Sequence, residues 1–457
     1  CSKASLERAY QRYADLSYAT ETKAGVFELS NEELEGLLAK VTSLQDVGKL
    51  IQEAVELKRA YRITRVLEVI LAGALALGAS DVHFEPEEKA MRLRYRLDGV
   101  LVDVLEIDHE TYRLSLSRLK LLSGLKLNVQ GEAQDGRFSI KIKGDEIELR
   151  TSILPGNYAE TVVLRLLNPK SIGVELEQLG LEEKLRLKLE KEIQKPNGMI
   201  LTTGPTGSGK TTTLYAFLRK VNSSGTKIIT IEDPIEYHLQ GLVQTQVDKK
   251  NYTFANGLRS ALRQDPDIIM VGEIRDSEVA ETAINAALTG HLVFSTLHTN
   301  DAAGSFPRLI DLGVDEKVLS SAVIAALAQR LVRKLCSNCK QVRQTTNDEQ
   351  QVINKFLGTI VDRALVPAET KQIWGAKEGG CPVCHGSGYK GRIAIFEAVF
   401  MDSAIETILR TKPSEREVYL AARPQGIPSM QEDGIIKVLR GVTSMDELRR
   451  VVDLDTQ

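Results

Sequence analysis

The chain has 457 residues, of which 42% are hydrophobic and 26% are charged. These fractions are typical of folded globular proteins, and they exclude disordered, collagen-like and mucin-like chains. Lysine and arginine total 59 against 62 aspartate and glutamate residues, so the formal charge of −3 gives no overall basic field to attract nucleic acid or anionic lipid. The length allows about three domains.

The first 62 residues are polar and rich in Glu, Leu, Ala and Lys, with apolar residues at helical spacing, as in Asn31–Lys40. We expect residues 1–62 to form a helical arm or a small helical module. Charges within Cys1–Arg8 stand where a signal peptide would have its apolar core, so we expect no export. The longest apolar stretch, Val69–Gly78, is far shorter than the roughly 20 residues of a transmembrane helix, and we expect no such helix.

Residues 63–168 begin with an apolar helix, predicted from Arg62 to Gly78, and continue with strands in which apolar and charged side chains alternate with the period of two that is typical of half-buried strands. The clearest segments are Met91–Gly99, Phe138–Gly144, Ile147–Ile153 and Thr161–Leu167, with a helix predicted at Tyr112–Gly124. The pattern predicts one α+β domain, followed by a linker at residues 169–173.

Continuous apolar runs replace this alternation over residues 174–330. Met199–Thr203, Lys227–Ile231, Asp267–Val271 and His291–Thr296 alternate with helical stretches. This pattern predicts an α/β domain whose parallel sheet is covered on both faces.

A phosphate-binding loop follows the first of these runs. The residues Gly204–Thr211 match the pattern G-x-x-x-x-G-K-[ST] between a predicted strand and a predicted helix. Glycines let the backbone approach phosphate, and the amides at the helix N-terminus supply partial positive charge. We expect ATP to be bound with Lys210 at the β- and γ-phosphates and the Thr211 hydroxyl in the Mg²⁺ shell. The expected binding residues are Gly204, Pro205, Thr206, Gly207, Ser208, Gly209, Lys210, Thr211 and Thr212.

Acidic and histidine side chains follow three other runs. Glu273 comes directly after an apolar strand, and it is our first candidate for the general base because ligands of α/β sheets collect at strand carboxyl ends. Glu232, Asp233 and Glu236 are second candidates for the Mg²⁺–water shell, with a solvated acidic turn as the alternative. By spacing alone, His291 is interpreted as a structural residue, and His298 is left open between a structural and a functional role.

Four of the five cysteines form two C-x-x-C pairs, Cys336–Cys339 and Cys381–Cys384, with 41 residues between them. Four thiolates in two such pairs favour a structural zinc site. Two disulfides or a redox pair are the alternatives, and the lack of an export signal disfavours disulfides. We expect a zinc module at residues 331–395, with His385 outside the ligand set, and a helical C-terminal subdomain at residues 396–457.

Together these segments resemble the secretion ATPases of type II secretion and type IV pilus assembly, over residues 63–457. Gly204–Thr211 is similar to the family's Walker A motif, Thr230–Tyr237 to its Asp box, Leu262–Asp276 to its Walker B motif and Thr289–Asn300 to its His box. Ala79–His83 and Gln134–Arg137 resemble its sensor-like N-terminal domain. The resemblance implies a RecA-like P-loop domain preceded by a PAS-like α+β domain. The pattern at Pro155–Glu160 departs from the family, and residues 1–62 are shorter than its usual docking domain.

The resemblance also implies roles for individual residues. It implies that Glu273 is catalytic and that Glu232, Asp233, His291 and His298 face the nucleotide. It further implies that arginines engage the phosphates as the two domains close, some of them across a subunit boundary. The matching residues are Arg150 and Arg165 in the first domain and Arg259, Arg263 and Arg275 in the second.

The activity implied is that of a homo-hexameric, Mg²⁺-dependent ATPase at the cytoplasmic face of an inner-membrane machine, bound to platform and membrane-associated proteins. The tetracysteine module and Ile427–Thr443 resemble assembly enzymes rather than retraction enzymes. We place type IV pilus assembly narrowly ahead of type II secretion, since the two share each motif. A zinc-bearing nucleic-acid motor is disfavoured by the near-neutral charge, and a non-hydrolysing scaffold by the presence of Lys210 and Glu273.

Overall fold

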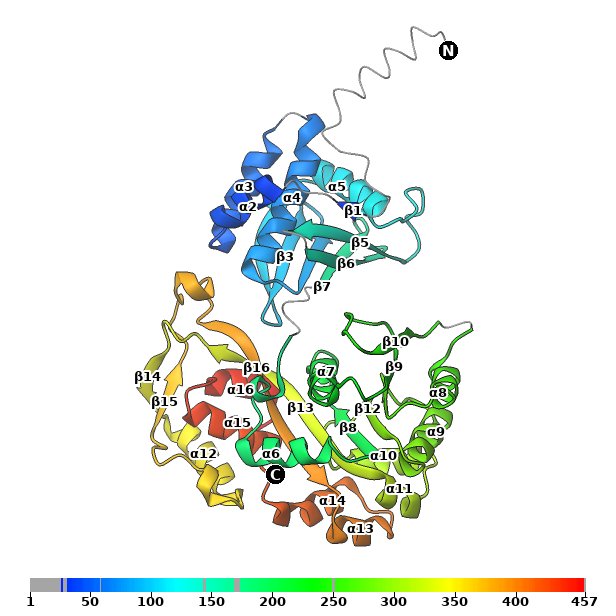
Figure 1. Cartoon of the computed structure of the whole chain (residues 1–457). Coiled ribbons are helices and arrows are strands. Elements are labelled where there is room, and N and C mark those ends of the chain that lie inside the picture. The colour runs from blue at the N-terminus through cyan, green and yellow to red at the C-terminus, as the bar shows by residue number, and fades with distance from the viewer. Residues whose placement is uncertain are drawn as a thin grey trace. The chain divides into compact units, whose positions relative to one another are not determined.

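The computed structural model describes residues 26–27, 31–57, 59–142, 145–167, 173–248 and 251–455. The chain divides into a first unit, residues 1–170, and a second unit, residues 171–457 (Figure 1). Cys1 and residues 169–172 of the expected linker lie outside the described residues. No helix in the described ranges is both long enough and apolar enough to cross a bilayer.

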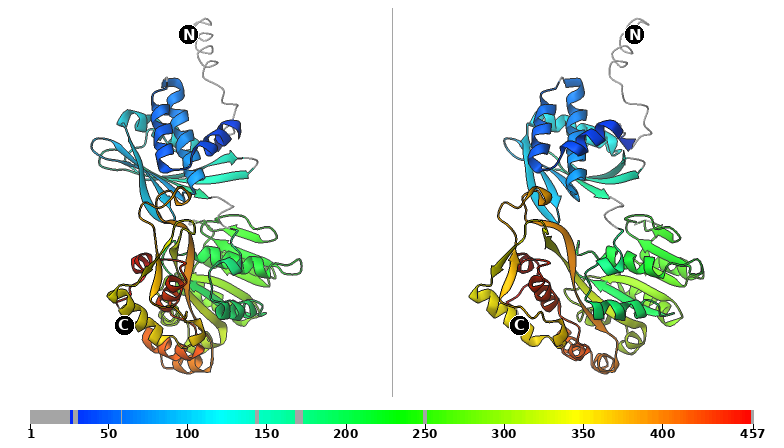
Figure 2. Two further views of the ribbon diagram at one scale, coloured as in Figure 1. Left: turned by 90° about the vertical axis from the view of Figure 1, so that its left-hand side faces the viewer. Right: turned by 60° about the vertical axis from the view of Figure 1, so that its left-hand side comes forward.

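The first unit is a sheet with helices gathered on one side (Figure 2). Its described strands follow the order β1-β5-β6-β7-β2-β3-β4, and neighbours are antiparallel except for β1 and β5. The helices are α2 (Asn31–Lys40), α3 (Leu44–Val55), α4 (Arg59–Leu77) and α5 (His109–Leu122). The strands are β1 (Val26–Phe27), β2 (Asp81–Pro86), β3 (Met91–Leu97), β4 (Val100–Ile107), β5 (Gln134–Ile142), β6 (Asp145–Leu154) and β7 (Thr161–Leu167).

The period-two pattern explains how this sheet is buried. Alternate residues of β3, such as Leu93 and Tyr95, are fully buried, because successive side chains of a strand point to opposite faces. Val47 and Ile51 of α3 share the same core with α4. The described part of the N-terminal segment is therefore packed into the first unit, and the boundary expected at residues 62 and 63 falls inside α4.

The second unit contains the larger set of elements. Its helices are α6 (Glu183–Glu192), α7 (Lys210–Val221), α8 (Phe254–Leu262), α9 (Ser277–Leu288), α10 (Ser305–Asp311), α11 (Glu316–Ala322), α12 (Asn347–Thr359), α13 (Ser403–Leu409), α14 (Glu415–Ala422), α15 (Met430–Leu439) and α16 (Met445–Val451). Its strands are β8 (Gly198–Thr203), β9 (Ile228–Glu232), β10 (Val243–Gln246), β11 (Ile268–Val271), β12 (Leu292–Leu297), β13 (Val323–Leu335), β14 (Gln341–Gln344), β15 (Gln372–Gly375) and β16 (Tyr389–Phe400).

The main sheet of this unit has the order β10-β9-β11-β12-β8-β13-β16 among the described strands. All neighbours are parallel except β13 and β16. The strands β8, β9, β11 and β12 are buried along their whole length, because α6 and α7 share a core with one face while α8 and α9 share a core with the other. The predicted parallel sheet covered on both faces is confirmed.

The cysteine pairs lie beside this same sheet. Cys336 directly follows β13, and four residues separate Cys384 from the start of β16. The small antiparallel pair β14 and β15 lies between them in the chain, together with α12. The boundaries expected at residues 330/331 and 395/396 therefore fall inside β13 and β16, so the cysteine module is continuous with the nucleotide-binding sheet.

Candidate nucleotide site and metal centre

The carboxyl ends of the parallel strands bring the predicted site residues to one edge of the sheet. β8 runs into Gly204, β9 ends at Glu232, β11 is followed by Glu273 and β12 by His298. The strand register determines how far along the sheet each residue lies, since Leu297 pairs with Thr203 and Val271 pairs with Ser295. The structure thus brings the phosphate loop, Glu273 and His298 together, as expected of an open α/β sheet.

The phosphate loop turns sharply out of β8. Gly204 has a φ of 135°, and a Cβ atom there would lie 2.5 Å from the backbone oxygen of Gln329, so only glycine fits. Lys210 opens α7, and its Nζ donates to the carbonyl oxygens of Gly204 at 2.7 Å and Pro205 at 3.1 Å. The first amides of α7 have no intrahelical acceptor, so the loop presents an ammonium group and backbone N–H groups together. Burial lowers the pKa of Lys210, and the charge of Glu273 opposes that shift.

Glu273 is the buried carboxylate of this edge. It is 8% exposed, its Oε2 lies 3.2 Å from Nε2 of His298, and its Oε1 pairs with Arg275. These two partners orient the carboxylate from both sides. A carboxylate fixed beside a phosphate loop is suited to polarise water.

Glu232 occupies a different setting, beneath the edge. It is 3% exposed and accepts hydrogen bonds from the Tyr215 hydroxyl, Thr230 Oγ1 and, at 3.1 Å, Gln244 Nε2. The carboxylate thus ties α7 to β9, and burial together with its charge raises the pKa of Tyr215. Asp233, the next residue, is exposed. Sequence reasoning missed Tyr215: it shares a helix face with Thr211, but the strand which that face meets is a matter of tertiary packing.

Three residues implied by the family resemblance lie elsewhere in this copy of the chain. His291 is at the amino end of β12, roughly 20 Å from its carboxyl end at about 3.3 Å per residue, and its Nδ1 lies 3.1 Å from the Ala286 carbonyl oxygen. Arg263 follows α8 and donates to Ser260 Oγ at 3.1 Å, and Arg259 pairs with Glu278 of α9. Within one copy, His291 therefore lies at the sheet edge opposite the phosphate loop, and the two arginines contact side chains of α8 and α9.

A row of arginines crosses the sheet of the first unit. Directly opposed residues of adjacent strands share a face, and the register opposes Arg150 to both Arg137 and Arg165. Asp81 lies next in the row, opposite Arg165 and Arg96, with Oδ1 3.0 Å from Nε of Arg165 and Oδ2 3.2 Å from Nε of Arg96. We call these four arginines the guanidinium row. Arg150 and Arg165 were expected as site residues, whereas Arg96 and the role of Arg137 in the row emerge only from strand register.

The four module cysteines form one cluster. Their Sγ atoms all lie within 4.8 Å of one another, with separations of 3.8 Å for Cys336–Cys381 and 3.7 Å for both Cys339–Cys384 and Cys381–Cys384. A tetrahedral zinc with Zn–S bonds of about 2.3 Å has Sγ–Sγ edges of about 3.8 Å, so the donor set fits this metal. The spacing is too long for disulfides, and the four thiols are free. The backbone amides of Cys381 and Gly388 donate to Cys384 Sγ at 3.1 Å and 3.2 Å, which fixes the position of this sulfur.

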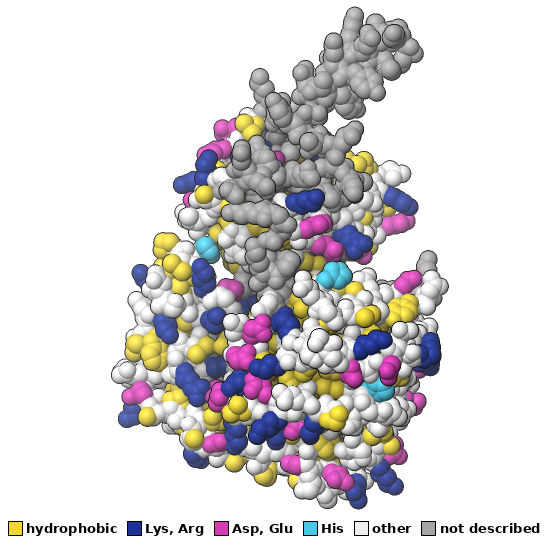
Figure 3. Space-filling view, viewed as in Figure 1, with side chains coloured by type: hydrophobic (Ala, Val, Ile, Leu, Met, Phe, Trp, Pro, Cys, Tyr) yellow, Lys and Arg dark blue, Asp and Glu magenta, His cyan; other side chains and the backbone are white. Residues whose placement is uncertain are grey.

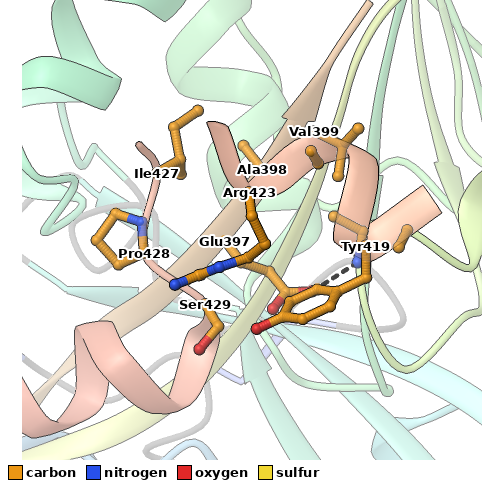
Figure 4. A pocket seen from close by; sticks show the side chains of 11 residues that line it. Glu397, Ala398, Val399, Tyr419, Arg423, Ile427, Pro428 and Ser429 are labelled. Atoms are coloured by element: carbon orange, nitrogen blue, oxygen red, sulfur yellow. Dashed lines mark hydrogen bonds between the residues drawn. The ribbon is translucent and has the colours of Figure 1, made fainter. Parts of the chain in front are cut away.

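A separate cavity lies behind the loop that follows His298. Glu397, Tyr419 and Arg423 contribute to its lining (Figure 4). Glu397 is partly buried, and its carboxylate accepts hydrogen bonds from the amides of Ala302 at 2.7 Å and Met430 at 3.1 Å. Burial raises the pKa of Glu397 to about 7. The side chain of Glu397 thus connects the loop that follows His298 to the start of α15.

A parallel sheet that carries a phosphate loop and a buried, oriented glutamate at its carboxyl edge defines a P-loop ATPase. A profile of the family described as Type II/IV secretion system protein matches residues 56–450. The chain therefore belongs to this family, and the resemblance drawn from its motifs is confirmed.

Two relatives show how far the similarity extends. The chain is 43% identical over 450 residues to the type II secretion system protein E of Pseudomonas aeruginosa. The alignment covers 98% of this chain and 86% of that protein. It is 41% identical over 392 residues to the type II secretion system ATPase E of Vibrio cholerae, covering 85% of this chain and 75% of that protein.

Solved structures share the fold. The pilus retraction motor PilT with bound ADP is 27% identical, with a TM-score of 0.55 over 83% of this chain and 95% of that chain. The ATPase DotB of Legionella pneumophila is 23% identical, with a TM-score of 0.59 over 84% of this chain and 94% of that chain. The predicted α/β fold is confirmed.

We expect Glu397 to make stability depend on pH. Its pKa in the folded chain, about 7, exceeds its usual value of 4.5, so between these values the folded state binds more protons than the unfolded state. Stability therefore falls as the pH rises from about 5 to about 7, by up to about 1.4 kcal/mol per pH unit. In the Glu397→Gln variant this fall should be absent, as measured by calorimetric melting of the full chain from pH 5 to 8.

The neighbouring charged groups set the control for this experiment. Asp301, Glu415, Glu432 and Arg423 surround Glu397, and the variant isolates one carboxyl among them. Glu406→Gln, at an exposed position of α13, should keep the wild-type profile. Parallel profiles for wild type and Glu397→Gln would contradict the prediction.

Proposed function

We propose that this chain hydrolyses ATP to power type II protein secretion. The observation that carries the proposal is the similarity to relatives named for that system, one of them named as an ATPase, over most of their length. These relatives favour type II secretion over pilus assembly, which the motifs alone had placed narrowly first. Acidic and basic side chains are interspersed over the face of the second unit in Figure 3, which does not favour a nucleic-acid motor.

The proposed chemistry follows from the edge of the second unit. The residues Gly204–Thr212 hold the phosphates, with Lys210 at the β- and γ-phosphates and Thr211 as a ligand of Mg²⁺. Glu273 orients and deprotonates the attacking water, while His298 and Arg275 keep its carboxylate in place. Glu232 supports this geometry from below by joining Tyr215 of α7 to β9.

The guanidinium row is proposed to supply positive charge to the phosphates when the two units close on ATP. Two of its four arginines, Arg96 and Arg165, both pair with Asp81, so one carboxylate serves two guanidinium groups. Arginines that meet charge developing in the transition state accelerate phosphoryl transfer strongly. Arg150 and Arg165 are the central pair.

The cysteine cluster is proposed to bind one structural Zn²⁺, with Cys336, Cys339, Cys381 and Cys384 as its ligands. The support is the match between their Sγ separations and a tetrahedral site. His385 adjoins the cluster in sequence but is left out of the ligand set, because four sulfurs already complete the tetrahedron.

We further propose a homo-hexamer that acts at the cytoplasmic face of the inner membrane, through platform and membrane-associated proteins of the secretion machine. Family membership supports this assembly. His291 lies at the sheet edge opposite the phosphate loop of its own copy, and we propose that it contacts a neighbouring subunit, together with Arg259 and Arg263.

Deleting the gene in its native host should abolish the release of secreted enzymes into the medium and leave surface pili intact. A plasmid copy of the wild-type gene should restore secretion, and one encoding Glu273→Gln should not, because the water is then no longer activated. Enzyme activities in culture supernatants and electron microscopy of pili measure the two outcomes. Loss of pili with normal secretion would favour pilus assembly instead.

Replacing Arg150 by alanine should reduce ATP hydrolysis by on the order of 100-fold or more while the nucleotide dissociation constant changes little. Steady-state turnover and calorimetric titration separate the two effects. Arg92→Ala is the matched control, since Arg92 lies on β3 outside the row. Loss of nucleotide binding without a turnover defect would refute the proposed role.

The purified chain should contain one zinc per chain by elemental analysis, and Cys384→Ser should lose most of it. Because metal binding is coupled to folding, the melting temperature of this variant should fall by roughly 5 °C or more. His385→Asn tolerates the left-handed backbone at that position and should retain the metal. Full zinc content in Cys384→Ser would exclude this ligand set.

A further inference from the structure

Gln329 contacts the phosphate loop from the neighbouring strand. It lies on β13, which pairs with β8 (Figure 1), and it is 1% exposed. Its Nε2 donates a hydrogen bond of 2.7 Å to the carbonyl oxygen of Ser208, inside the loop. A Cβ atom on Gly209 would lie 3.0 Å from the same Nε2. The backbone of Gln329 therefore lies against Gly204, and its side chain lies against Ser208 and Gly209.

This hydrogen bond fixes the direction of an amide that belongs to the phosphate cradle. The carbonyl of Ser208 and the N–H of Gly209 belong to one peptide unit. In a trans peptide they point in opposite directions. Because Gln329 holds the carbonyl on its own side, the Gly209 N–H is directed away from β13. It stands at the N-terminus of α7, where backbone amides bind phosphate.

Stability does not explain a glutamine at this place. Its Oε1 is buried without a hydrogen-bond partner among the described residues, and so is the Ser208 hydroxyl. Burying an unpaired amide oxygen costs free energy, which offsets part of what the hydrogen bond from Nε2 to Ser208 contributes. The net contribution of Gln329 to folding is therefore small. Its hydrogen bond instead fixes the backbone of the phosphate loop, which binds the ligand.

We propose that Gln329 is a positioning residue that holds the phosphate loop in its nucleotide-binding shape. The proposal rests on the use of ATP in the proposed function, but it concerns binding by the purified chain and does not depend on which machine the ATPase serves. It assigns to β13 a role in phosphate recognition beyond its place in the sheet.

The test compares Gln329→Met with Val332→Ala in the purified full-length chain. Methionine keeps the length of the side chain and removes the donor, so we expect ADP and ATP to bind roughly tenfold more weakly, with a matching rise in KM. We expect kcat to change much less and the melting temperature to stay close to the wild-type value, because the unpaired Oε1 is removed while the Ser208 carbonyl oxygen loses its donor. Val332 is fully buried on the same strand, so its truncation should lower the melting temperature and leave nucleotide affinity unchanged.

A second variant and a baseline complete the design. Gln329→Glu places an acceptor against the Ser208 carbonyl and should bind nucleotide less well than Gln329→Met, provided calorimetry shows a folded chain. Wild-type affinity in Gln329→Met would overturn the proposal, and so would a joint fall in affinity and melting temperature like that of a packing defect. Absence of ATP hydrolysis by the wild-type chain would count against the proposed function, whereas equal affinities in an active enzyme would count only against Gln329.

Discussion

The parallel pairing of β8 with β12 on one side and β13 on the other is the constraint on which the nucleotide site depends. Thr203, the last residue of β8, pairs with Leu297 and with Ala328. The next residues along the three strands are Gly204, His298 and Gln329. The same register therefore places the start of the phosphate loop between His298 and Gln329. The Thr203 hydroxyl reinforces this register: its oxygen accepts from the Thr299 amide at 2.8 Å and lies 3.1 Å from the carbonyl oxygens of Leu297 and Thr299, which share its single proton.

β13 carries this constraint beyond the nucleotide edge. Its far end leads to Cys336, and its antiparallel partner β16 begins near Cys384, so a metal bound by the cluster would join the outer ends of two paired strands. The side chain of Arg333 donates to the buried carboxylate of Glu447 on α16 at 2.7 Å and 2.9 Å. The strand is thus held at both ends and at its side. A strand fixed in this way can keep Gln329 at a constant height against the loop.

Local patterns allowed the fold and half of the site to be predicted. The phosphate loop, Lys210 and Glu273 could be found because each depends on a short motif at the end of an apolar strand. The helices, the strands and the parallel sheet followed from hydrophobic period. Spacing alone also assigned His291 a structural place, because it stands before its strand rather than after it, and in this copy it lies at the amino edge of β12.

The remaining features depend on contacts that no local pattern encodes. Tyr215 and Glu232 meet across a helix and a strand, Gln329 meets Ser208 across 121 residues, and Glu397 meets Ala302 across 95. The module boundaries were misplaced for the same reason: the cysteine motif is local, but the membership of β13 and β16 in the main sheet is set by pairing. The directions of Arg150 and Arg165 likewise required the strand register.

The distribution of charge gives the near-neutral composition a physical meaning. At the nucleotide edge, Glu273 is matched by Arg275 and His298, which leaves Lys210 and the amides of α7 to meet the phosphates. The guanidinium row keeps like charges directly opposed across adjacent strands, an arrangement that is destabilising by itself, and Asp81 only partly compensates it. The strand register of the first unit therefore keeps like charges side by side at a cost in stability.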